Sequence, residues 1–142
     1  MTGLWVVGVA VLLALGFGLY RKAVDGRVGA SGRAEGLDPV RLGEPLGDRA
    51  TFVQFSTQFC APCRVAGRVL GEVSAATTGV SHIEVDAEQR LDLVGEWGIT
   101  RTPTVLLVDG EGVVRNRIVG APRKQDVQRA LEELLDRQEA SL

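Results

Sequence analysis

The chain has 142 residues, of which 45% are hydrophobic, and its formal net charge at pH 7 is −2. This length fits one small globular domain with an extra segment, and the hydrophobic content is sufficient for a core. The near-neutral charge excludes the basic surface typical of nucleic-acid binding. Two cysteines among 18 glycines exclude a disulfide-rich scaffold.

The first predicted element is an apolar helix over residues 4–20, which contains no charged side chain. A helix of this length spans about 26 Å, close to the thickness of the hydrocarbon core of a bilayer. Trp5 and Tyr20 stand at its two ends, where interfacial aromatic residues are common. A cleaved signal peptide needs basic residues before the apolar run, and none is present there. We therefore interpret residues 1–24 as an uncleaved single-pass transmembrane anchor.

The charges beside this helix predict its orientation. Only the terminal amine precedes the helix, whereas four basic residues follow it: Arg21, Lys22, Arg27 and Arg33. The positive-inside rule then places the rest of the chain in the cytoplasm.

Residues 25–47 are rich in glycine and charged residues, contain Pro39 and Pro45, and show no sustained hydrophobic period. This composition predicts a flexible linker. Within it, Val40-Arg41-Leu42 is a candidate for a short edge strand.

Residues 48–142 have the pattern of a folded α/β domain. Strands are predicted at 51–56, 82–86, 104–108 and 113–119. Helices are predicted at 60–76, at 87–96 with Asp86 as the cap, and from Pro122 onward. The apolar residues expected to face the core from these helices are Val65, Val69 and Val73, then Leu91 and Val94, then Val127, Ala130, Leu131, Leu134 and Leu135.

The two cysteines, Cys60 and Cys63, lie where a predicted strand is followed by a predicted helix. A helix N-terminus carries unpaired N–H groups and a partial positive charge, which stabilise a thiolate and make it a nucleophile. Pro62 fits the first turn, where its missing N–H removes no hydrogen bond. Cys63 lies one turn along the helix, close enough to attack a mixed disulfide formed by Cys60. The same spacing also occurs in zinc sites.

Two stretches of the chain resemble the thioredoxin family. One is Phe59-Cys60-Ala61-Pro62-Cys63-Arg64, and the other is Trp97-Gly98-Ile99-Thr100-Arg101-Thr102-Pro103-Thr104. The resemblance covers residues 48–142 and implies a thioredoxin-like α/β fold, with a central mixed sheet flanked by helices, after an N-terminal single transmembrane helix. It implies that Cys60 attacks, that Cys63 resolves the mixed disulfide, and that no cofactor besides this disulfide is needed.

The resemblance also implies roles for the neighbours of the cysteines. Ala61 and Pro62 would tune the redox potential, and Phe59 would form an apolar wall where thioredoxins usually have Trp. Pro103 matches the family's cis-proline, and the backbone of Thr102 would pair with a substrate strand. Trp97 is expected in the core, and Gly120 is expected to leave room for the backbone near the active face.

Two positions depart from the family pattern. Gln54 replaces an Asp that thioredoxins usually bury, and an amide cannot accept the proton of the resolving thiol. His82, the only histidine, stands where the family often has Lys, and a neutral imidazole there could supply the missing base. The alternative for His82 is a partly exposed residue at a strand end.

We therefore expect a membrane-tethered thiol–disulfide oxidoreductase that acts as a protein-disulfide reductase. Its partners would be protein or small-molecule disulfides, a redox partner that recycles the dithiol, and the membrane through residues 4–20. No nucleic-acid partner is expected. Because many membrane-tethered bacterial proteins of this family face outward, an extracytoplasmic domain is the alternative location.

The competing function is a metal carrier. Cu(I) accepts soft thiolates, although no methionine lies near the cysteine pair. A closed zinc site needs four ligands, and the chain offers two cysteines and one distant histidine. We therefore expect no metal site and treat copper transport as the alternative function.

Overall fold

The structure is a computed structural model that describes residues 1–24, 28–30 and 36–142. Arg27 and Arg33, which contributed to the predicted orientation, lie outside the described residues, as do the parts of the predicted linker at 25–27 and 31–35. The elements in chain order are α1 (Thr2–Val24), β1 (Val28–Ala30), α2 (Pro39–Leu42), β2 (Ala50–Ser56), α3 (Ala61–Ala76), β3 (Val80–Asp86), α4 (Leu91–Glu96), β4 (Thr104–Asp109), β5 (Val114–Val119) and α5 (Lys124–Ala140).

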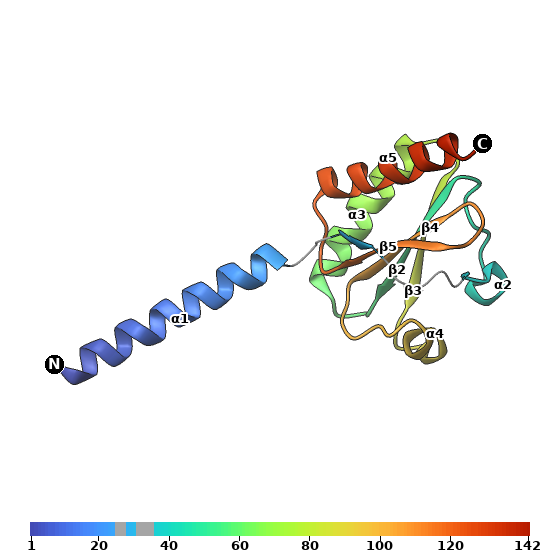
Figure 1. The fold of residues 1–142 in the computed structure, drawn as a ribbon. Coiled ribbons are helices and arrows are strands. Elements are labelled where there is room, and N and C mark those ends of the chain that lie inside the picture. The colour runs from blue at the N-terminus through green and yellow to red at the C-terminus, as the bar shows by residue number, and fades with distance from the viewer. Residues whose placement is uncertain (25–27, 31–35) are drawn as a thin grey trace.

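A single five-stranded sheet organises the domain, in the strand order β1-β5-β4-β2-β3. The β2–β3 pair is parallel and the other pairs are antiparallel, so the sheet is mixed. Helices α3 and α5 cover one face of the sheet, and α4 and α2 lie on the other (Figure 1). The predicted α/β class with a central mixed sheet flanked by helices is confirmed.

Strand β2 lies inside the sheet and is buried on both faces, which explains its nearly continuous apolar sequence. Phe52 packs with the α3 and α5 helices, whereas its neighbour Val53 packs with α2 and α4. This alternation follows from the two-residue period of side chains in a strand. The strand therefore ends at Ser56 with its position fixed from both sides, directly before the cysteine motif.

Helix α1 stands apart from the sheet, and its described side chains are exposed (Figure 1). Residues Thr2–Ala23 have a mean hydropathy of 2.2 and are long and apolar enough to cross a membrane. A signal sequence near an N-terminus has the same length and composition. The helix is therefore a candidate membrane span.

The range predicted as a linker contains regular structure. Strand β1 pairs antiparallel with β5, with Val28 opposite Ile118. The expected edge strand at residues 40–42 is wrong, because this segment belongs to the helical turn α2, with Pro39 at its first position. Leu37 and Leu42 are buried in the core on the α4 side of the sheet. These leucines attach the segment to the domain.

The helices match the predicted pattern with shifts in register. The buried residues of α3 are Cys63, Ala66, Leu70 and Val73, so the expectation for Val65, which is exposed, is wrong. Helix α4 starts later than predicted and buries Leu93, whereas Leu91 is 70% exposed.

Asp86 does not cap α4 as predicted. Its Oδ1 accepts the Glu88 N–H at 2.9 Å within the preceding turn, and the N-cap of α4 is Arg90. The five predicted core residues of α5 are all buried, and so is Trp97. The apolar spacing thus predicted the long C-terminal helix correctly.

Candidate active site

Cys60 and Cys63 form a disulfide at the start of α3, with their Cα atoms 5.2 Å apart. Cys60 is the N-cap residue and has an extended backbone, and its Sγ accepts the Cys63 N–H at 3.2 Å. Pro62 occupies the first turn, where no N–H is required. Cys60 is partly exposed, whereas Cys63 is only 3% exposed. The two sulfurs are therefore chemically unequal in their access to solvent.

The surface around Cys60 is open. Ala61 and Pro62 are exposed, and Phe59 is 93% exposed. The aromatic ring of Phe59 is thus available for contact with another molecule and is not part of the core. Single exposed apolar residues are ordinary on protein surfaces, but this one directly precedes the partly exposed Cys60.

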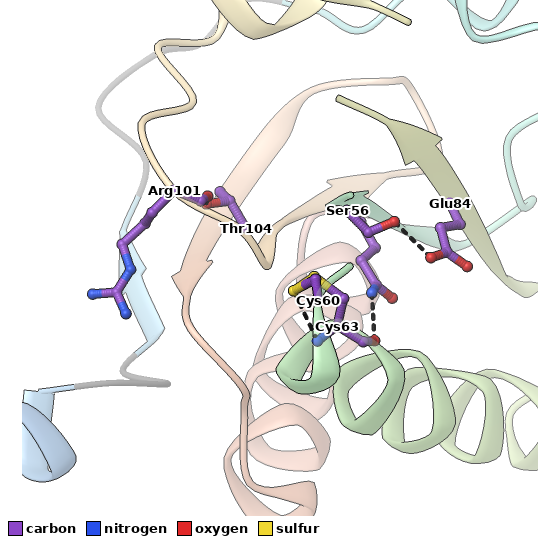
Figure 2. Close-up of a disulfide and its surroundings, with 7 residues drawn as sticks. Ser56, Cys60, Cys63, Glu84, Arg101 and Thr104 are labelled. Atoms are coloured by element: carbon purple, nitrogen blue, oxygen red, sulfur yellow. Dashed lines mark hydrogen bonds between the residues drawn. A yellow bond between two sulfur atoms is a disulfide. The ribbon is translucent and has the colours of Figure 1, made fainter. Parts of the chain in front are cut away.

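A cleft of about 570 Å³ opens beside the disulfide. Its walls come from the β2–α3 junction and from the end of β3, and the lining residues are Ser56, Thr57, Gln58, Cys60, Cys63, Arg64, Glu84, Asp86 and Gln89. Figure 2 shows Ser56 and Glu84 on one side of the disulfide, where the Ser56 hydroxyl donates to Glu84 Oε1 at 2.6 Å. Sequence reasoning missed both residues, although each lies at or near the end of a strand that flanks the motif.

The loop before β4 lies on the other side of the disulfide, where Figure 2 shows Arg101 and Thr104. The peptide bond between Thr102 and Pro103 is cis. Pro103 is buried, and its carbonyl accepts the Gly120 N–H at 2.8 Å. Gly120 has a φ of 86°, a backbone conformation that favours glycine. Thr102 is partly exposed next to this buried anchor.

A fully buried amide, that of Gln54 on β2, lies beneath the disulfide. Its Nε2 donates to the carbonyl oxygen of Cys63 at 2.8 Å, and its Oε1 lies 2.9 Å from Nε2 of His82 on β3. A backbone carbonyl only accepts hydrogen bonds, so the NH₂ group of Gln54 must face Cys63. The Oε1 that faces His82 also only accepts, so His82 Nε2 carries a proton and donates it to this bond.

His82 is half-buried, and burial lowers its pKa below the ordinary 6.5 despite the opposing influence of the Glu84 and Glu44 carboxylates. The imidazole is then neutral near pH 7, with its single N–H at Nε2. A nitrogen that already carries a proton cannot accept another. His82 is therefore linked by hydrogen bonds to the active-site helix through Gln54, to which its Nε2–H donates.

Metal binding was the alternative function for the cysteine pair. Over residues 1–24, 28–30 and 36–142, no group of three or more His, Cys, Asp or Glu side chains is arranged to hold a metal ion. The two sulfurs are bonded to each other. The geometry of this site is that of a dithiol–disulfide couple.

Comparison with known proteins points to one family. The sequence profile of the thioredoxin family matches residues 45–133. An H-type thioredoxin from Picea mariana is 34% identical over 82 residues, which are 57% of this chain and 63% of that relative. Thioredoxin 2 from Chlorobaculum tepidum is 30% identical over 87 residues, which are 61% of this chain and 79% of that relative. The chain thus spans less than two thirds of the length of the H-type relative.

Solved structures show the same likeness. A thioredoxin from Nicotiana alata superposes with a TM-score of 0.53 at 28% identity, covering 61% of this chain and 73% of that one. Chloroplastic thioredoxin z superposes with a TM-score of 0.55 at 20% identity, covering 61% of this chain and 79% of that one. The second likeness supports the fold alone.

Proposed function

Since the chain belongs to the thioredoxin family, we propose that it is a membrane-tethered thiol–disulfide oxidoreductase that reduces protein disulfides with Cys60 and Cys63. The observation that carries this proposal is the placement of the partly exposed Cys60 at the N-cap of α3 with the buried Cys63 one turn behind it. Substrates would be protein or small-molecule disulfides. A dithiol or reductase partner would return the oxidised pair to the dithiol.

The reaction would proceed in two exchanges. In the reduced protein, the Cys60 thiolate attacks one sulfur of a substrate disulfide, forms a mixed disulfide and releases the other substrate sulfur as a thiolate. Cys63 then loses its proton, attacks Cys60 Sγ and releases the second substrate thiolate. Two electrons pass to the substrate, two protons are returned to its sulfurs, and the Cys60–Cys63 disulfide remains.

The positive end of α3 supports the first exchange. A thiolate at the N-cap is stabilised by the unpaired N–H groups of the first turn and by the helix dipole. Cys60 Sγ already accepts the Cys63 N–H in the oxidised state. Burial would disfavour ionisation of Cys63. The two residues therefore suit different roles, with Cys60 as the nucleophile and Cys63 as the resolving thiol.

The surroundings of Cys60 suit a macromolecular substrate. Phe59 offers an exposed aromatic surface next to the nucleophile, and Thr102 is partly exposed beside the buried Pro103. We propose that a substrate strand pairs with the backbone at Thr102 while an apolar side chain contacts Phe59. Ala61 and Pro62 would set the redox potential through the geometry of the helix start.

We propose that α1 anchors the protein in a membrane with the catalytic domain on the cytoplasmic side. The support is the length and hydropathy of Thr2–Ala23 together with Arg21 and Lys22 in its last turn. In the reducing cytoplasm such a domain acts as a reductase.

The test uses the full chain in detergent micelles. The protein is reduced, freed of reductant and mixed with a protein disulfide, and the released thiols are counted against the Cys60–Cys63 disulfide formed. We expect one substrate disulfide reduced for each disulfide formed. The oxidoreductase proposal fails if substrate thiols are released but no Cys60–Cys63 disulfide forms. It also fails if no thiols are released, and the metal-carrier function gains support if the pure protein then binds Cu(I) stoichiometrically.

A further inference from the structure

We propose that His82 and Gln54 form a hydrogen-bond chain that positions Cys63 for the resolving step, and that His82 acts in it as a donor and not as the base for the Cys63 thiol. The proposal rests on the oxidoreductase function proposed above. It gives the two departures from the family pattern one shared role. Both residues would be positioning residues, because neither reacts with the substrate.

The Cys63 carbonyl determines which group donates and which accepts in each of the two hydrogen bonds. The Cys63 carbonyl can only accept, so the Gln54 amide is oriented with Nε2 toward it at 2.8 Å. Gln54 Oε1 then faces His82 Nε2 at 2.9 Å and needs a donor. Reversing either group would place two donors or two acceptors opposite each other. The Cys63 carbonyl thus selects one orientation of the amide, the amide requires a proton on His82 Nε2, and the Gln54–Cys63 bond holds the first turn of α3.

The burial of Gln54 makes a wrong orientation of its amide costly. Gln54 is fully buried, so an amide oxygen without a partner there would lose its hydration with nothing in return. Gly67 of α3 lies over the amide, and a Cβ atom at Gly67 would be 3.5 Å from Gln54 Oε1 and 4.0 Å from His82 Cε1. Helix α3 therefore packs closely against the hydrogen-bonded pair Gln54 and His82.

The chemical consequence concerns the second exchange. Cys63 must present its sulfur in line with the Cys60–substrate bond, and its backbone is held from beneath by Gln54. An amide takes up no proton, and the His82 nitrogen that faces it is already protonated. Neither residue therefore takes the proton of Cys63 through this contact, and the Cys63 thiolate displaces the substrate sulfur from Cys60. His82 affects this rate through geometry alone.

Two substitutions at one position separate a donor from a base. His82→Gln keeps an N–H at about the reach of Nε2 but has no basic group in the physiological range. His82→Leu keeps an apolar body and removes the donor. We expect the Gln variant to resolve mixed disulfides at nearly the native rate and the Leu variant to be slower by about fivefold, the loss of one modest hydrogen bond. In both variants the attack by Cys60 should be unchanged.

A double-mutant cycle tests whether His82 acts through Gln54. Gln54→Met keeps the length of the side chain and removes both hydrogen bonds. If the chain is one unit, His82→Leu should slow resolution in the native background and have no further effect when Gln54→Met is present. Additive effects would overturn the coupling. If Gln54→Met does not fold, the His82 pair alone decides the proposal.

Thr51→Val is the matched control for general loosening of β2. Thr51 is fully buried on the same strand as Gln54, and its Oγ1 accepts the Gly47 N–H at 2.8 Å. It lies near the start of β2, whereas the cysteines follow the end of that strand. This variant should lose stability without changing the ratio of the resolving rate to the attack rate. If it slows resolution as much as His82→Leu does, the effect is structural and the positioning role is rejected.

The measurement is rapid mixing of the reduced full chain in micelles with a small peptide disulfide, with acid-quenched mass analysis of the mixed disulfide. If the native protein forms no mixed disulfide at Cys60, the proposed function itself fails. If the mixed disulfide forms and His82→Leu resolves it at the native rate, only the positioning role fails. Equal slowing of resolution in His82→Gln and His82→Leu also overturns the positioning role. That result would mean that His82 has a function that another hydrogen-bond donor cannot replace.

Discussion

The backbone N–H of Cys63 donates to the Sγ of Cys60 at 3.2 Å, so the sulfur of Cys60 also caps the helix that carries Cys63. One turn of α3 therefore determines both the position and the electrostatic environment of the pair. When the disulfide is reduced, the same N–H points at the Cys60 thiolate. The geometry favours charge on Cys60 and leaves Cys63 buried behind it.

The first prediction concerns the roles of the cysteines. Cys63→Ala should accumulate mixed disulfides with its substrates, because Cys60 can still attack and nothing resolves the product. Cys60→Ala should accumulate none, because Cys63 is 3% exposed. Non-reducing electrophoresis of each variant after exposure to a protein disulfide measures the trapped species. The reverse pattern would exchange the two roles.

The second prediction concerns Phe59, which is 93% exposed beside the nucleophile. Phe59→Ala should raise the KM for protein disulfides several-fold and leave the reaction with a small peptide disulfide nearly unchanged, because only a larger substrate reaches the ring. The free energy of unfolding should change by less than about 0.5 kcal/mol, as for other surface substitutions. Steady-state kinetics with the two substrates measure this difference. An equal change for both would show that the residue acts on the thiol chemistry.

The third prediction is a pH dependence of stability from His82. Burial lowers its pKa in the folded state, while Glu84 and Glu44 act in the opposite direction. Between this lowered pKa and 6.5 the unfolded chain binds more protons than the folded one, so stability falls as the pH is lowered through this window. Urea unfolding of the native protein and of His82→Gln at pH 7.5 and below pH 6 measures the contribution. The loss on acidification should be smaller in the variant, and an equal loss would contradict the assignment.

The fourth prediction concerns Asp109 at the start of the β4–β5 turn. Its buried carboxylate accepts the Glu111 and Val113 N–H groups at 3.0 and 2.9 Å and the Arg115 Nε–H at 2.7 Å. Asp109→Ala should lower the free energy of unfolding by about 2–3 kcal/mol, because three hydrogen bonds to one buried carboxylate are lost. Chemical denaturation measures it, with the exposed Glu111→Ala in the same turn as control. Similar stabilities for the two variants would contradict the structural role.

The fifth prediction concerns the side of the membrane. A fluorescent protein fused to the C-terminus should fluoresce in bacterial cells, and alkaline phosphatase fused at the same place should be inactive, because Arg21 and Lys22 in the last turn of α1 favour the cytoplasm. An active phosphatase fusion would place the domain outside. The enzyme would then be an extracytoplasmic disulfide reductase, and its electron donor would have to act across or within the membrane.

Some of the fold could be predicted from the sequence because certain residue patterns fit only one type of secondary structure. Phe52, Val53 and Phe55 form a nearly continuous apolar run that suits a strand covered on both faces. The spacing of Val127, Ala130 and Leu134 defines one face of a helix. Cys60 and Cys63 could be located because their chemistry requires a short spacing at a helix start.

Other features depended on tertiary context. The register of α3 was misjudged because small residues, Cys63 and Ala66, fill its buried face while a valine points to solvent. Glycine-rich composition around Gly29 predicted a flexible segment, but pairing with β5 determines its structure. The bond from His82 to Gln54 joins residues on two strands, and its direction follows only from the Cys63 carbonyl at the far end.

The pairing of β1 with β5 ties the start of the folded domain closely to the apolar helix α1. Three residues, 25–27, separate the end of α1 from the first strand of the sheet, and three residues span at most about 11 Å even when fully extended. A linker over the whole of residues 25–47 would have let the dithiol sample a large volume around its anchor. In the membrane-tethered form proposed above, the sheet would lie close to the lipid headgroups, and Cys60 would range over a smaller volume than a linker over residues 25–47 would allow. Disulfides carried on other membrane proteins would then be more accessible to it than those on freely diffusing proteins.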